Sequence, residues 1–148
     1  MEQIKQIGAY GLILKDNKIL LINKVGGPYD GKLDLPGGTI EWGETPEAAL
    51  IRELEEEVGI NIIEYEIFDG DAVTIEWMHK NKIEQIHHIG FFYIIKNFKN
   101  DIKSEILITK QNDDSKGARF YDISNLKKSN LSAIAQIELE KLGYIIDW

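Results

Sequence analysis

The feature that most constrains this 148-residue chain is a glycine-rich segment followed closely by a well-marked helix. Residues 25–38 hold five glycines and two prolines, a composition that predicts a long loop. Thr45 is suited to cap the helix, Pro46 to begin it and Gly59 to end it. Apolar residues between these positions recur at helical spacing and predict its buried face: Leu50, Ile51, Leu54 and Val58.

Four glutamates crowd the last turns of this predicted helix: Glu53, Glu55, Glu56 and Glu57. Carboxylates there oppose the helix dipole at about 0.3–1 kcal/mol each, and like charges three or four residues apart cost roughly 0.2–0.5 kcal/mol per pair. Glu53, Glu56 and Glu57 share one face, whereas Glu55 is expected to face water. A solvated acidic face is one interpretation. We favour a site for a hard divalent cation, because the glycine-rich loop lets backbone approach a ligand.

Composition and charge exclude several classes of function. The formal charge is −8 and no basic stripe is visible, so we do not expect binding to a long nucleic acid. The absence of cysteine excludes disulfides, thiolate zinc sites and cysteine nucleophiles. No apolar run approaches the roughly 20 residues that span a membrane, and the first twenty residues do not form a signal peptide. We therefore expect one cytoplasmic domain over residues 1–148, without membrane contact.

The rest of the pattern predicts strands and one further helix. Apolar runs at 7–14 and 19–22 flank the turn formers Asp16 and Asn17, which predicts a hairpin. Further strands are predicted at 64–68, 73–77, 89–95, 106–109 and 119–123, with a turn at 79–82. Residues 131–142 predict a second amphipathic helix that Gly143 ends. Strands with two separated helices predict an α/β fold with a mixed sheet covered on both sides.

Gly38, Glu44 and the run Arg52–Ile60 together resemble the Nudix box, and every defined position of that pattern is filled. Residues 34–38 also resemble the usual approach to the box, although Leu33 stands where many members carry tryptophan. The resemblance, to the MutT-like Nudix hydrolases, implies the Nudix fold, an α/β/α sandwich. It also implies Mg²⁺- or Mn²⁺-dependent hydrolysis of a diphosphate bond in a nucleoside diphosphate linked to another moiety. A non-catalytic Nudix-type domain that binds a nucleotide as a sensor is the alternative.

The same resemblance assigns roles to residues of the box. Glu53, Glu56 and Glu57 would be metal-binding carboxylates, with the carbonyl group of Gly37 or Gly38 as a further ligand. Glu44 and Arg52 would brace the loop against the helix as an ion pair. Glu53 is one candidate for the general base. Some relatives place a catalytic carboxylate on a later loop, which makes Asp114, ahead of Asp113, a second candidate.

For residues outside the box, the sequence supports fewer predictions of function. Trp42 and Asn130 are candidate substrate contacts, and alternation along a strand would turn one of His87 and His88 inward. A histidine base is an alternative to a structural role for that pair. Four aromatic residues could stack on a base or belong to the core: Tyr29, Trp77, Phe91 and Phe92. The expected partner is a small nucleotide-type substrate, whose identity the sequence does not decide. The sequence also leaves open whether the chain forms a homodimer.

Overall fold

The structure, a computed structural model, describes residues 1–102 and 115–148. Its strands are β1 (Glu2–Leu12), β2 (Leu14–Lys15), β3 (Lys18–Lys24), β4 (Leu33–Asp34), β5 (Gly37–Thr39), β6 (Asn61–His79), β7 (Lys82–Lys99) and β8 (Ser115–Asp122). Its helices are α1 (Pro46–Val58) and α2 (Ala133–Lys141), with short 3-10 turns at Ile123–Asn125 and Lys128–Asn130. The strand predicted at 106–109 lies outside the described residues.

The described strands form two sheets. In the first, the order is β5-β1-β7-β6, and β1 runs parallel to β7 but antiparallel to β5. In the second, β3 pairs antiparallel with β2, β4 and β8. The first sheet is therefore mixed, and the α/β fold class predicted from the sequence is confirmed.

The longest pairing is the hairpin of β6 and β7, which closes on Lys80 and Asn81 with φ values of 50° and 63°. Positive φ at both central residues suits a two-residue hairpin turn, so the predicted turn at 79–82 is confirmed. The strands predicted separately at 64–68 and 73–77 are one strand, β6. The register of β6 against β7 shifts between residues 62 and 69, which marks local irregularities in the pairing. The polar residues between the two predicted segments have a weak preference for β-structure, and pairing with β7 overrides it.

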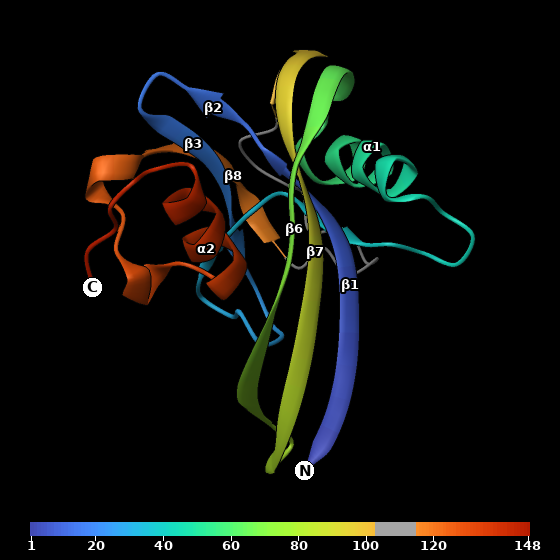
Figure 1. Ribbon diagram of the computed structural model, residues 1–148, viewed down its shortest axis with the longest axis vertical. Helices are drawn as coiled ribbons and strands as arrows, with labels where there is room; N and C mark the ends of the chain where they lie inside the picture. The colour runs from blue at the N-terminus through green and yellow to red at the C-terminus, as the bar shows by residue number, and fades with distance from the viewer. Residues whose placement is uncertain (103–114) are drawn as a thin grey trace.

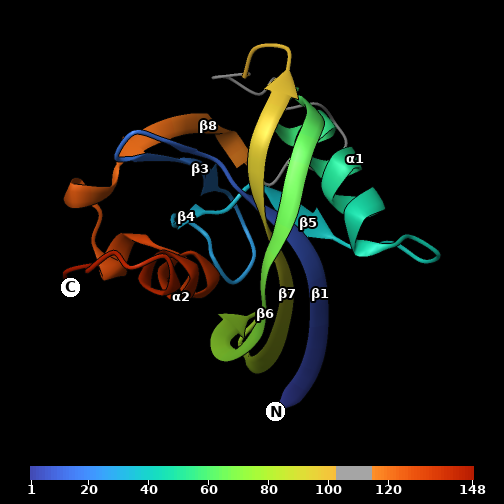
Figure 2. The same ribbon diagram turned by 45° about the horizontal axis from the view of Figure 1, so that its top comes forward.

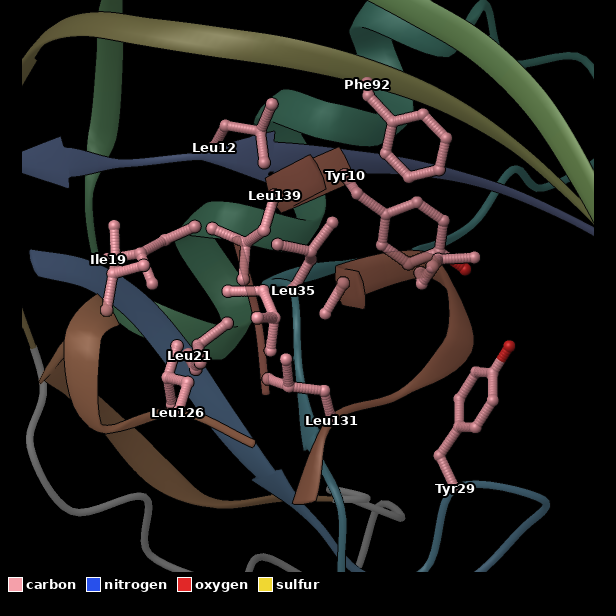
Figure 3. Packing of buried hydrophobic residues seen from close by; sticks show 14 residues of the cluster. Tyr10, Leu12, Ile19, Leu21, Tyr29, Leu35, Phe92, Leu126, Leu131 and Leu139 are labelled. Atoms are coloured by element: carbon pink, nitrogen blue, oxygen red, sulfur yellow. The ribbon is translucent and has the colours of Figure 1, made fainter. Parts of the chain in front are cut away.

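The two helices lie on opposite sides of the strands, as Figures 1 and 2 show. Side chains of β3 alternate between the two resulting cores: Leu21 packs in the core that includes α2, and Leu20 in the core that includes α1. Figure 3 shows the α2 core, where Leu21, Leu35 and Leu139 are buried together. Burying a leucine side chain stabilises a fold by about 1.5–3 kcal/mol, so both helices are held by apolar contact.

Helix α1 begins and ends where the sequence predicts. The Thr45 hydroxyl accepts a hydrogen bond from the Ala48 N–H group at 3.1 Å, and Pro46 occupies the first turn. Gly59 adopts φ 78°, and its N–H group donates to the Glu55 carbonyl at 3.0 Å. No basic residue lies in the last turn, so within α1 only Arg52, one turn earlier, offsets the acidic cluster there. Among the helices in the described ranges, none is both long and apolar enough to cross a membrane.

Candidate active site

A cavity of about 300 Å³ lies where β5, the C-terminal half of α1 and the loop after β3 meet. Its walls include eight of the residues singled out in the sequence: Tyr29, Gly37, Gly38, Arg52, Glu53, Glu56, Glu57 and His88. Glu44 is not among the lining residues, but it is hydrogen-bonded to Arg52, which is. Trp42 is fully exposed, and neither Trp42 nor Asn130 lines this cavity. Asp114 and Asp113 lie outside the described residues.

Gly37 and Gly38 are required by close packing of β5. Gly37 has φ 137°, and a Cβ atom there would overlap the Ala9 carbonyl oxygen of β1. A Cβ atom on Gly38 would lie 2.7 Å from the carboxyl carbon of Glu53. The two glycines therefore let β5 pair with β1 while the Glu53 carboxylate lies directly on the backbone.

Arg52 ties the loop before α1 to the helix. Its Nε and Nη2 atoms donate to the two carboxylate oxygens of Glu44 at 2.8 Å each, and Nη2 also donates to the Thr39 carbonyl at 3.0 Å. Its Nη1 atom donates to Glu53 at 2.9 Å and to Glu56 at 3.3 Å. The hydrogen bonds from Arg52 lower the pKa of Glu44 to about 2. This forked geometry suits the bracing role expected of the pair.

The three carboxylates of the shared helix face differ in environment. Glu57 accepts a hydrogen bond from the Gly37 N–H group at 2.9 Å, and burial raises its pKa to about 8. Burial also raises the pKa of Glu53, although its bond to Arg52 opposes the shift. Glu56 is mostly exposed, and Glu55 is exposed as expected. Such a set of hard oxygen donors around a polar cavity fits a divalent cation, whose charge would favour the ionised forms.

Asp34 is a buried polar residue of the cavity that the sequence argument did not single out. It accepts hydrogen bonds from the Ser132 hydroxyl at 2.6 Å and from the Leu35 N–H group at 2.8 Å. Ser132 in turn caps α2 by accepting from the Ala135 N–H group. Asp34 therefore connects the cavity wall to the start of the second helix. The available signal was an aspartate placed between two leucines in residues 33–35.

His88 is turned inward between two tyrosines, while His87 is exposed, as alternation predicts. The Tyr10 hydroxyl lies 2.5 Å from His88 Nε2 and the Tyr29 hydroxyl 2.9 Å from Nδ1. Burial lowers the pKa of His88 to about 4, so the ring is neutral at pH 7. A neutral ring donates from one nitrogen only, so one tyrosine donates to it and the other accepts. The accepting tyrosine therefore does not use its own O–H proton in its contact with His88.

Comparison with known proteins identifies relatives for the whole arrangement. A family model described as the NUDIX domain matches residues 5–139. An ADP-ribose pyrophosphatase of Methanocaldococcus jannaschii is 35% identical over 118 residues, which are 80% of this chain and 62% of that protein. An 8-oxo-dGTP diphosphatase of Escherichia coli is 43% identical over 63 residues, 41% of this chain and 49% of the other. The chain thus spans between about half and three fifths of the length of these relatives.

The fold has close counterparts among solved structures. The crystal structure of a MutT NUDIX hydrolase from Burkholderia pseudomallei superposes with a TM-score of 0.71, covering 93% of this chain and 98% of the other. The sequence identity is 24%, so this likeness bears on the fold alone. Together with the matched family model, it supports a Nudix fold with one mixed sheet, one antiparallel sheet and two helices.

Proposed function

The chain belongs to the Nudix family, and from that premise we propose that it hydrolyses a diphosphate bond in a nucleoside diphosphate derivative, with Mg²⁺ or Mn²⁺ as cofactor. The observation that carries the proposal is the pair Glu53 and Glu57, which line one cavity beside the glycines of β5. Glu57 is oriented by the Gly37 N–H group and Glu53 by Arg52. Both carboxylates are thus held ready to bind a cation without reorganising the loop.

In this proposal each residue of the box has a separate task. Glu53, Glu56 and Glu57, with a carbonyl group of Gly37 or Gly38, hold the cation. When bound, the cation would stabilise negative charge on the phosphate oxygens and would lower the pKa of bound water. Glu53 accepts the proton of the attacking water, with Asp114 as the alternative acceptor. Arg52 and Glu44 position Glu53 rather than reacting, because both are committed to each other through two hydrogen bonds.

The substrate class follows from the relatives and from the polarity of the cavity. Two relatives are named for ADP-ribose and for 8-oxo-dGTP, both of which carry linked phosphates on a nucleoside. The cavity is also lined by Lys24, Gly26, Gly27 and Tyr29, which would lie beside such a ligand. We propose a small nucleotide of this kind, with Trp42 and Asn130 as outer contacts from their flanking loops.

A substrate panel with product analysis tests the proposed activity. ADP-ribose, 8-oxo-dGTP, nucleotide sugars and dinucleoside polyphosphates would each be incubated with the protein and Mg²⁺ or Mn²⁺, with a chelator as control. We expect release of a nucleoside monophosphate from at least one compound, and none with the chelator. Thermal stabilisation by a ligand with no turnover of any compound would instead identify the sensor alternative.

The stability of the metal-free protein is expected to fall as the pH rises from about 5 to 8. The pKa of Glu57 is raised from 4.5 to about 8, so in this window the folded protein holds a proton that the unfolded chain releases. Melting temperatures in chelator at pH 5, 6.5 and 8 measure the slope, which should be shallower in Glu57→Gln. Mg²⁺ should raise the melting temperature more at pH 8 than at pH 5, because metal binding displaces this proton. Equal slopes for the two proteins would contradict the assignment of the proton to Glu57.

A further inference from the structure

A second group of carboxylates lies between β6 and α2, and none of its members lines the cavity described above. Asp69 and Asp71 come from β6 and Glu138 from α2, and one carboxylate oxygen from each lies within 4.8 Å of the other two. The Lys141 ammonium group bridges Asp69 and Asp71 at 2.6 Å to each. Because α2 and α1 cover opposite sides of the strands, this cluster is separate from the acidic face of α1 (Figure 1).

Glu138 is the unusual member of the cluster. Its side chain is fully buried, and within the described residues neither of its carboxylate oxygens has a hydrogen-bond partner. A buried, unpaired carboxylate is strongly disfavoured. Its neighbour Asp69 offers only acceptor oxygens when ionised, so the two carboxyl groups need either a shared proton or a cation between them. The arrangement therefore requires positive charge beside the carboxyl group of Glu138. Lys141 supplies only part of this charge, because its ammonium group is bonded to the two aspartates.

We propose that Asp69, Asp71 and Glu138 bind a hard divalent cation, best matched by Ca²⁺, which displaces the Lys141 ammonium group. Ca²⁺ binds oxygen ligands at about 2.3–2.6 Å, so ligands on opposite sides of one ion lie up to roughly 5 Å apart. The three oxygens all lie within 4.8 Å of one another, which is inside this range. Mg²⁺ demands shorter distances and closer to ideal octahedral geometry, which makes it a poorer match.

The surroundings of the cluster allow a cation to replace the Lys141 ammonium group. The Lys141 side chain is 41% exposed and can move into solvent, and the exposed fractions of Asp69 and Asp71 leave room for water ligands on that side. Three carboxylates with one ammonium group carry a net charge of −2, which a divalent ion in place of the ammonium reduces to −1. The ion would join β6 to α2 and so stabilise the folded state. The proposal stands independently of the proposed hydrolytic activity.

Calcium titration of a protein that lacks the first site provides the test. In a Glu53→Gln/Glu57→Gln background, Ca²⁺ binding would be followed by isothermal titration calorimetry and by melting temperature. We expect one bound ion and a rise of at least about 4 °C when Ca²⁺ is 100-fold above its dissociation constant. Adding Lys141→Gln should tighten binding at least about fivefold, because a competing positive charge is removed.

Matched variants on the same helix decide the outcome. Glu138→Gln should abolish the calcium-induced rise, and Glu140→Gln, an exposed glutamate of α2, should leave it unchanged. Asp71→Asn, at a half-exposed position, repeats the test if Glu138→Gln fails to fold. A rise that persists in both Glu138→Gln and Asp71→Asn would overturn the proposal. So would the absence of calcium binding in Lys141→Gln, which would leave Glu138 and Asp69 as a proton-sharing pair.

Discussion

Glu57→Gln is expected to lower kcat/KM at least about 100-fold on any substrate that the panel identifies. The substitution preserves size but removes the charge of the carboxylate that the Gly37 N–H group orients in the cavity. Since burial already disfavours the ionised form of this group, only a bound cation would make its charge useful there. Steady-state kinetics at several Mg²⁺ concentrations measure the effect, and the metal-induced rise in melting temperature should shrink in parallel.

Glu55→Gln is the matched control for that experiment. Glu55 undergoes the same chemical change two residues away, but its side chain is exposed and points away from the cavity-lining face. We expect kcat/KM within about twofold of the unmodified protein, since exposed substitutions rarely disturb a fold by more than about 0.5 kcal/mol. A loss of less than twofold in Glu57→Gln, equal to that of Glu55→Gln, would remove Glu57 from the metal site.

Gly37→Ala is expected to have the largest effect on stability. Its φ of 137° is a conformation that alanine rarely adopts, and the added Cβ atom would overlap the Ala9 carbonyl oxygen. Backbone strain costs about 1–3 kcal/mol and overpacking a similar amount. For a chain of this length a loss of about 3 kcal/mol lowers the melting temperature by roughly 6–12 °C. Thermal unfolding followed by circular dichroism measures the shift.

The variant Gly43→Ala separates the destabilisation caused by backbone strain from that caused by steric overlap. Gly43 also has positive φ, at 82°, but a Cβ atom there meets nothing within 4 Å. The expected loss is about 1 kcal/mol, or roughly 2–4 °C. If Gly37→Ala and Gly43→Ala were equally stable, the close approach of β5 to β1 would not be the reason for glycine at 37.

Local signals in the sequence were enough to predict α1 and the residues that gather at its end. Thr45, Pro46 and Gly59 set the helix boundaries through short-range hydrogen bonds and φ preferences, which do not depend on the rest of the fold. The helical spacing of Glu53 and Glu57 places both on the cavity side, and the structure brings them to Gly37 and Gly38. How these residues act in the reaction stays a prediction.

Such local signals could not predict which strands pair when they are far apart in the sequence. The parallel pairing of β1 with β7 joins segments about eighty residues apart, and nothing in either segment names its partner. The length of β6 was underestimated for the same reason, because the polar stretch around Asp69 is held in the sheet by β7. Burial of Asp34 and Glu138 was similarly hidden, since burial of a polar side chain depends on what packs over it.

The alternation of β3 between two cores has a consequence for how the molecule unfolds. Leu20 and Leu21 are consecutive in the chain, yet each is buried with a different helix. Neither helix can therefore detach without exposing one face of the same central strand. Amide hydrogen exchange should report one global opening for β3, at the full free energy of unfolding, rather than two independent sub-global events. Two halves that each carry a helix would in this way behave as a single cooperative unit.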